Sequence, residues 1–263
     1  MNNIFPFGQK LKDVVQLERE QKDIFVLGVY ASAVHAKWLD IYNRVIIQAL
    51  AVASEPYIFW RGDMAANIIA NIEMREELGK LVPANSNLNG PSGNALDQMY
   101  LNPMGCDRSN SWLCDLVPHS CLNSNQLKAI QQHYNPLIEE YNLPVPNIPP
   151  VPKELANEKR RQEIILEMIA ARPKLIILLG DEPIKWFLAH YNKEYTKLEH
   201  FGYTTDLYGR VHRIVLEQKE YNFLPLVHPR QAAGLGNHSS SLRQLHNYWV
   251  QNVASSIRTQ YLL

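Results

Sequence analysis

The sequence predicts an α/β fold, a three-layer sandwich in which helices flank a central, mainly parallel four-stranded sheet. Short apolar runs alternate with segments of helical periodicity, which is the pattern of successive strand and helix units. The run 175–179 is continuously apolar, as expected for a strand buried on both faces. The four strand-like runs end in turn residues, at Gly28, Pro118, Gly180 and the step His228-Pro229.

The length and charge of the chain limit its architecture. Its 263 residues suit one large α/β domain, so we expect a single domain over residues 1–263. Within it we expect an irregular insertion at about 82–110 and a proline-rich connection at about 142–152. The 26 basic residues balance 26 acidic ones, which argues against a protein that coats nucleic acid globally and leaves room for a local basic groove.

Targeting and metal signals are missing from the sequence. The first residues lack a signal-peptide pattern and no apolar run reaches the length of a membrane span, so we expect a cytoplasmic protein without membrane contact. Cys106, Cys114 and Cys121 lack CxxC spacing, which argues against a disulfide framework, a zinc ribbon or an iron-sulfur cluster. We expect free thiols and no metal or cofactor. The sequence leaves the oligomeric state open.

The first half of the chain predicts helices over 10–22, 40–52 and 64–81, with a strand over 24–27 between the first two. Residues 82–107 are rich in Asn, Pro, Gly and Ser and are expected to be mostly loop. A second strand follows at 111–117 and stops at Pro118. A helix is then expected from 125 toward 141.

The second half repeats the strand and helix pattern. After the extended, proline-rich segment 143–152 we expect a helix over 153–171, the strand 175–179 and a helix over 182–191. The basic run 159–161 has glutamates nearby and is expected to be a solvated helix face. A hairpin is expected around residues 207–209, followed by the strand 223–227 and a packed helix over 239–258.

The His-Pro step is the most informative position. In an open parallel sheet, ligands bind in the crevice beyond the carboxyl ends of the strands, where loops project side chains from a rigid scaffold. His228 would stand there, and Pro229 disfavours continuation of the regular strand. On its own, His228 is better explained as a strand-end histidine beside a turn. The other strand ends change that balance.

Four short motifs, taken together, resemble the uracil-DNA glycosylase superfamily over about residues 24–250. They are the turn after strand one (Val26-Leu27-Gly28-Val29-Tyr30-Ala31-Ser32), the second strand around Asp115, the step Leu178-Leu179-Gly180 and the step Val227-His228-Pro229. The resemblance implies a glycosylase-like sandwich that acts on DNA. It implies that His228, with Tyr30, is catalytic and that Gly28, Val29 and Asp115 bind the base. It also implies that DNA contacts come from Ser32, Arg230, Leu235, His238 and Ser239.

Two departures from the family pattern bear on mechanism. Tyr30 and Ala31 stand where active members offer a water-positioning Asp or Asn and a shaping proline, and a tyrosine is a poor general base near neutral pH. Asp115 replaces an Asn that reads uracil, so base preference should change. Asp115 either receives an exocyclic amino group or caps a backbone donor, and the sequence favours neither. Leu235 is either a wedge in the space of a flipped base or a packed loop residue.

The sequence therefore predicts a glycosylase-like protein that recognises a damaged or deaminated base in DNA. Hydrolysis of the N-glycosidic bond, with weakened water activation, is the expected reaction. The alternative is a non-catalytic nucleic-acid or nucleotide-binding module on the same fold. An unrelated doubly wound hydrolase is disfavoured, since GxSxG, P-loop and HExxH patterns are missing.

Overall fold

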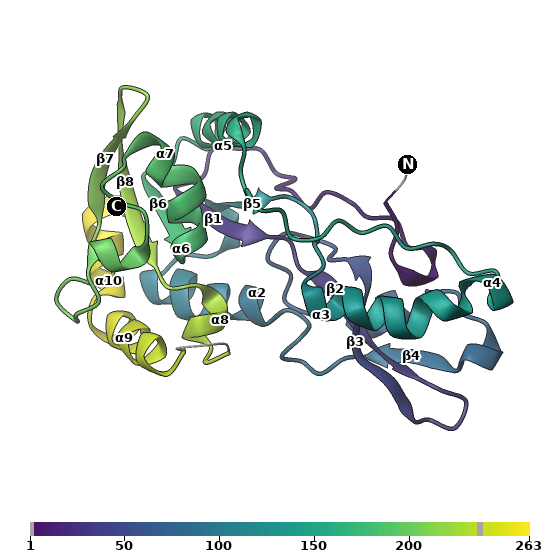
Figure 1. Cartoon of the computed structure of the whole chain (residues 1–263). Coiled ribbons are helices and arrows are strands. Elements are labelled where there is room, and N and C mark those ends of the chain that lie inside the picture. Colours follow the sequence, from purple (N-terminus) through teal and green to yellow (C-terminus); the bar gives the residue numbers. More distant parts are fainter. Residues whose placement is uncertain (1–2, 236–238) are drawn as a thin grey trace. The chain divides into compact units, whose positions relative to one another are not determined.

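The computed structural model describes residues 3–235 and 239–263 (Figure 1). The chain forms two compact units, each assembled from separate stretches of sequence. The first unit comprises Met1–Val14, Tyr30–Pro91 and Pro118–Lys153. The second unit comprises Val15–Val29, Ser92–Val117 and Glu154–Leu263. Among the described helices, none is long and apolar enough to cross a membrane.

The second unit is built on a five-stranded sheet in the order β5-β1-β6-β8-β7. Its strands are β1 (Ile24–Tyr30), β5 (Ser111–Val117), β6 (Leu175–Leu179), β7 (His212–Leu216) and β8 (Lys219–Leu226). β1 and β8 both run parallel to β6, whereas β7 is antiparallel to β8. The predicted α/β class is confirmed, and the expected count of four strands is wrong because β7 adds a fifth.

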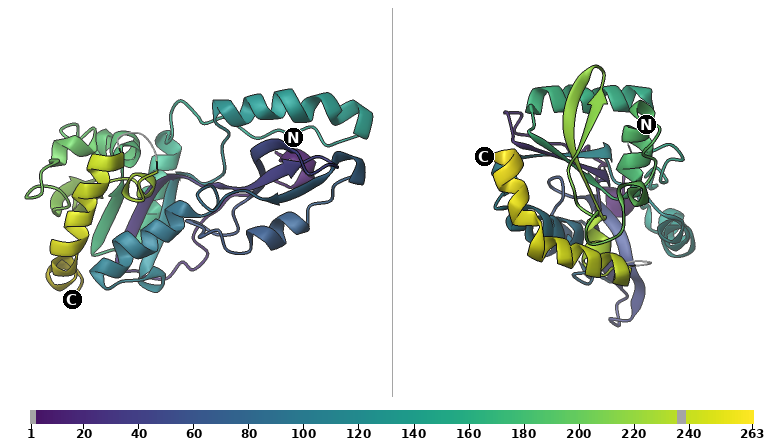
Figure 2. Two further views of the ribbon diagram at one scale, coloured as in Figure 1. Left: turned by 90° about the horizontal axis from the view of Figure 1, so that it is seen from below. Right: turned by 90° about the vertical axis from the view of Figure 1, so that its left-hand side faces the viewer.

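Helices cover both faces of this sheet (Figures 1 and 2). One face carries α5 (Glu158–Ala171), α6 (Asp181–Pro183) and α7 (Ala189–Tyr191). The other carries α2 (Pro91–Ala95) and α9 (Ser239–Asn252), with α8 (Pro229–Ala232) and α10 (Ala254–Ile257) beside α9. Every residue of β5 and β6 is buried, as expected for strands between two helical layers.

The expected loop at 82–110 is partly helical. α2 begins at Pro91, a residue that suits the first helical position because its missing N–H is not needed there. The helix continues through a π turn over Leu96–Leu101, in which Leu96, Tyr100 and Leu101 are buried. The burial of these apolar side chains outweighs the turn-like composition around them.

The first unit contains a three-stranded antiparallel sheet in the order β3-β2-β4. The strands are β2 (Ala33–Leu39), β3 (Val45–Ser54) and β4 (Lys80–Pro83). α1 (Ala65–Ala70) lies on one face of this sheet, and the helical run that starts with α3 (Ser124–Ala129) and ends with α4 (Ile138–Tyr141) lies on the other (Figure 2). Phe7, Trp38 and Tyr134 meet edge to face in its core.

Several predicted helices are wrong. Most of the expected helix 40–52 is strand β3, and the expected helix 64–81 contains α1, a 3-10 turn and β4. Residues 10–22 form no helix. The segment 45–54 is rich in Val, Ile and Ala, and an apolar run of this length fits either a strand or a buried helix. Pairing with β2 decides the outcome.

The predicted hairpin is displaced along the chain. β7 and β8 are joined by Glu217 and Gln218, both with positive φ, as a two-residue hairpin turn with a right-handed strand twist requires. The expected turn around 207–209 instead places Tyr208 in the core, where 2% of it is exposed. The C-terminal helix is present and is divided at Val253 into α9 and α10.

Candidate functional site

His228 caps the short helix that follows β8. It has extended backbone angles, and its Nδ1 accepts a hydrogen bond of 3.2 Å from the backbone N–H of Arg230. Its own backbone N–H is bonded to the side chain of Gln231 at 3.4 Å, which completes a capping box. Pro229 occupies the first helical position, where its fixed φ favours the helix. The histidine therefore lies directly beyond the end of β8, as predicted.

The protonation state of His228 follows from these contacts. Burial, and secondarily the positive charge of Arg230, lower the pKa of His228 from 6.5 to about 4, so the imidazole is neutral at pH 7. A neutral imidazole carries one N–H, and Nδ1 is already an acceptor. The proton therefore resides on Nε2. His228 offers a neutral N–H donor at the edge of the sheet.

Gly180 lies beside His228, and Gly28 lies one strand further along the sheet. Gly180 follows β6, and its N–H donates to the carbonyl of Leu226 at 2.7 Å. It has a φ of +89°, and a Cβ there would lie 3.1 Å from the Cβ of His228. β1 is the neighbour of β6 with Leu27 opposite Leu178, so buried Gly28 and half-buried Val29 continue to the same edge. The structure thus brings three of the four motifs together.

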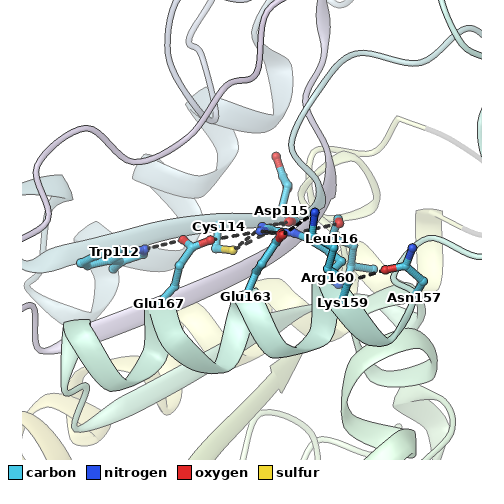
Figure 3. A network of polar contacts seen from close by, with 9 residues as sticks. All are labelled: Trp112, Cys114, Asp115, Leu116, Asn157, Lys159, Arg160, Glu163 and Glu167. Carbon is cyan, nitrogen blue, oxygen red and sulfur yellow. Dashed lines mark hydrogen bonds and ion pairs between the residues drawn. The ribbon is translucent and has the colours of Figure 1, made fainter.

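Asp115 lies on β5, next to β1, and only 4% of it is exposed. Its backbone carbonyl accepts a hydrogen bond of 2.7 Å from Arg160, while its carboxylate points away from that guanidinium (Figure 3). In the part of the chain that the structure describes, its carboxylate oxygens have no hydrogen-bond partner. Burial raises the pKa of Asp115 from 3.8 to about 7; Arg160 lowers it, and Glu167 adds a smaller increase. Both protonation states are therefore accessible near neutral pH.

Arg160 secures the edge strand β5 from helix α5 (Figure 3). Its guanidinium donates to the carbonyls of Asp115 and Leu116 and to the sulfur of Cys114. It also pairs with Glu163 and Glu167, at 3.2 Å each. The expectation that the basic run 159–161 is a solvated face is wrong for Arg160 and Arg161, because only 13% and 12% of their side chains are exposed. It holds for Lys159, at 86%.

Glu167 extends this network by accepting a hydrogen bond of 2.9 Å from the indole N–H of Trp112. Trp112 and Cys114 share the face of β5 toward α5, so period-two alternation places Asp115 on the opposite face. The network fixes the backbone of β5, but Arg160 forms no ion pair with the Asp115 carboxylate. This is an arrangement that periodicity in one sequence does not reveal.

The loop after His228 has a defined geometry. Leu235 N–H donates to the carbonyl of Arg230 at 2.7 Å, and Gly234 N–H donates to that of Gln231 at 3.0 Å. With Gly234 at a φ of +78°, these bonds form a Schellman cap. Leu235 is half-buried, which fits both interpretations of this residue.

An arginine that sequence reasoning missed stands beside this loop. A Cβ on Gly234 would lie 2.8 Å from Nη1 of Arg243, a residue of α9. Arg243 and Arg230 are both exposed, so two cations flank the turn that follows His228. One signal in the sequence could have indicated Arg243, namely its place in a predicted helix that begins close to the His-Pro loop.

The remaining predicted site residues are Tyr30, Ser32, His238 and Ser239. Ser239 begins α9, and His238 lies outside the described residues. Tyr30, the last residue of β1, and Ser32 belong to the first unit. Tyr30 is 39% exposed, and the carbonyl of Ser32 accepts a hydrogen bond from Ser120. Roles of these residues toward DNA stay predictions.

Comparison with protein-family models and with curated proteins finds no match. Among residues 3–235 and 239–263, no group of three His, Cys, Asp or Glu side chains is arranged to hold a metal ion. The chemistry of the site therefore has to be argued from its own side chains.

Proposed function

We propose that this protein recognises a damaged or deaminated base in DNA and hydrolyses its N-glycosidic bond. The observation that carries the proposal is the place of His228 at the carboxyl edge of a parallel sheet, beside Gly180, with its Nδ1 bonded to the backbone of Arg230, which leaves Nε2 as the donor of the neutral ring. This is where ligands bind in open α/β sheets. The order of the glycosylase-like motifs supports the same interpretation.

The proposed chemistry uses His228 as an electrostatic catalyst. When the bond between C1′ and the base nitrogen breaks, its electron pair goes to the base, and negative charge develops on a base carbonyl oxygen. A fixed N–H donor stabilises that charge more than it stabilises the neutral base, which lowers the barrier. Water then adds to C1′ and releases a proton to solvent.

Asp115 is proposed to contact the edge of the base. Of the two roles open from the sequence, capping of a backbone donor has no support, because the described residues supply no N–H to its carboxylate. A protonated carboxyl offers a donor and an acceptor, as an amide does, whereas the ionised form accepts only. The ionised form suits a base with an exocyclic amino group. Substrate preference should therefore change with pH around 7.

The test is a cleavage assay with oligonucleotides that carry uracil, hypoxanthine, xanthine or a mismatched base, scored as abasic sites. His228→Ser keeps an N-cap oxygen for Arg230 and removes the Nε2–H donor, so product should fall by about 10²-fold or more. His133→Ala, at an exposed histidine of the first unit, is the matched control and should be unchanged. Equal product from His228→Ser and the wild type would refute catalysis by His228.

A non-catalytic binding module is the second candidate, and Tyr30 is the observation that favours it. Its hydroxyl is a weak base at pH 7, and it occupies the place of the water-activating residue. In this case all substrates stay intact while DNA still binds. Affinity should fall with salt, and Arg230→Ala should reduce the salt slope by about 0.9 if it contacts one phosphate. Lack of DNA affinity at low salt would contradict both candidates.

A further inference from the structure

We propose that Tyr208, oriented by buried His246, positions His228 by fixing the backbone of Val227, the residue that precedes it. This inference rests on the proposed role of His228. Tyr208, His246 and Val227 all belong to the second unit. Neither Tyr208 nor His246 is part of any motif identified in the sequence, and neither contacts the base in this proposal.

Two tyrosine hydroxyls bind the backbone of Val227, one on each of the two peptide groups that this residue joins. Its N–H donates to the hydroxyl of Tyr208 at 3.0 Å, and its carbonyl accepts from the hydroxyl of Tyr100 at 2.7 Å. The pairing of β8 with β6 ends one residue earlier, at Leu226 opposite Leu179. The carbonyl of Leu226 still accepts from Gly180, and the next two backbone groups, the N–H and the carbonyl of Val227, are bound by side chains.

The directions of the hydrogen bonds that link Tyr208 and His246 follow from one group that can only accept. The carbonyl of Met99 can only accept, and it lies 3.0 Å from Nε2 of His246, so Nε2 carries a proton. Burial lowers the pKa of His246 to about 4, so the ring is neutral at pH 7 and Nδ1 is an acceptor. Tyr208, 2.8 Å from Nδ1, must donate to it. Its oxygen is then oriented to accept the N–H of Val227.

Aromatic packing holds this chain of bonds in place. His246 is fully buried, with ring centroids 4.3 Å from Tyr100 and 5.2 Å from Trp249. The indole N–H of Trp249 donates to the carbonyl of Gly209 at 3.1 Å, next to Tyr208. Helix α9 thus supplies His246, the acceptor for the Tyr208 hydroxyl, and Trp249, which binds the backbone of the next residue, Gly209. A change in the backbone of Val227 would break at least one of its hydrogen bonds to Tyr208 and Tyr100.

The consequence is a fixed orientation for His228. The Nδ1 atom of His228 accepts from Arg230 only while the backbone at 227–228 keeps its N-cap geometry. If the peptide is released, Nδ1 loses this partner, the ring gains solvent, and both the tautomer and the pKa of His228 should change. Those two properties can be measured without any substrate.

The experiment compares the histidine side-chain NMR spectra of the full-length wild type and Tyr208→Phe across pH. The matched control is Tyr134→Phe, which removes a buried tyrosine hydroxyl that likewise accepts one backbone N–H (Phe7) and donates to one carbonyl (Pro144) in the first unit. In Tyr208→Phe we expect the pKa of His228 to rise toward about 6.5 and its Nε2–H tautomer to lose dominance. Tyr134→Phe should leave both unchanged.

An unchanged His228 spectrum in Tyr208→Phe, or an equal change in Tyr134→Phe, would overturn the inference. If Tyr208→Phe does not fold, Tyr100→Phe replaces it. That variant removes only the donor to the Val227 carbonyl, and the same shift, smaller in size, is expected; no shift would again refute the inference. With an active wild type, Tyr208→Phe should lower kcat at unchanged KM. A wild type without activity would refute the proposed function while the NMR result still decides this inference.

Discussion

Replacing Asp115 with Asn should remove a pH-dependent loss of stability from this protein. The carboxyl is 4% exposed, and burial raises its pKa from 3.8 to about 7 in the folded state. Between these two values the folded state keeps a proton that the unfolded state has released. Stability from this group is therefore fully present below the unfolded pKa and is lost as pH rises to about 7.

The size of the effect follows from the two pKa values. With a pKa of 3.8 in the unfolded state and about 7 in the folded state, proton linkage lowers the free energy of unfolding by about 2.5 kcal/mol between pH 5 and pH 8. Asn has the same shape and does not titrate. Any constant cost of the buried amide cancels when one variant is compared with itself at two pH values.

The assay is urea unfolding of the wild type and Asp115→Asn at pH 5 and pH 8. The free energy of Asp115→Asn minus that of the wild type should increase by about 2.5 kcal/mol from pH 5 to pH 8. Asp107→Asn is the control, because Asp107 is exposed and hydrogen bonds from Ser109 lower its pKa, so its titration lies below this range. A difference between Asp115→Asn and the wild type that is constant over this range would refute the reasoning.

Two further predictions concern the scaffold of the site. Arg160→Ala should lower the free energy of unfolding by about 3–5 kcal/mol, because it leaves buried Glu167 without its cation. Lys159→Ala, on the same helix, should change it by less than about 0.5 kcal/mol; equal effects in urea unfolding would contradict the assigned role of Arg160. Gly180→Ala should cost about 1–3 kcal/mol, because it forces a side chain into a conformation essentially restricted to glycine and presses against His228. A thermal midpoint equal to that of the wild type would argue against this strain.

Sequence patterns located the strands of the larger sheet because those strands carry their signal locally. β1, β5, β6 and the end of β8 each contain a mainly apolar run with a Gly or Pro at or close to its end. β3 is not bounded by Gly or Pro on either side, and β4, which follows Gly79 and ends at Pro83, is only four residues long. The apolar spacing of both segments also fits a helix, so both were predicted wrongly. Strand pairing with β2 decides their conformation, and pairing partners are not visible from local periodicity.

The site divides in the same way. The positions of Gly180 and His228 just beyond strand ends follow from local turn chemistry, since a Gly or a His-Pro step follows each apolar run. The expectation that a strand ends at Gly28 is wrong, because β1 continues through Gly28 to Tyr30. The isolation of the Asp115 carboxylate does not, because it depends on Arg160, 45 positions away, binding the backbone of β5 and not its side chain.

The sequence by itself determined that Pro118, Gly180 and the His228-Pro229 step follow strands, and in what order they occur. Only the tertiary structure decided their chemical state. The neutral form of His228 and the raised pKa of Asp115 arise from burial, and the hold on Val227 arises from Tyr100, 127 positions away. Desolvation and hydrogen bonds between distant segments exist only after folding, so no local pattern encodes them.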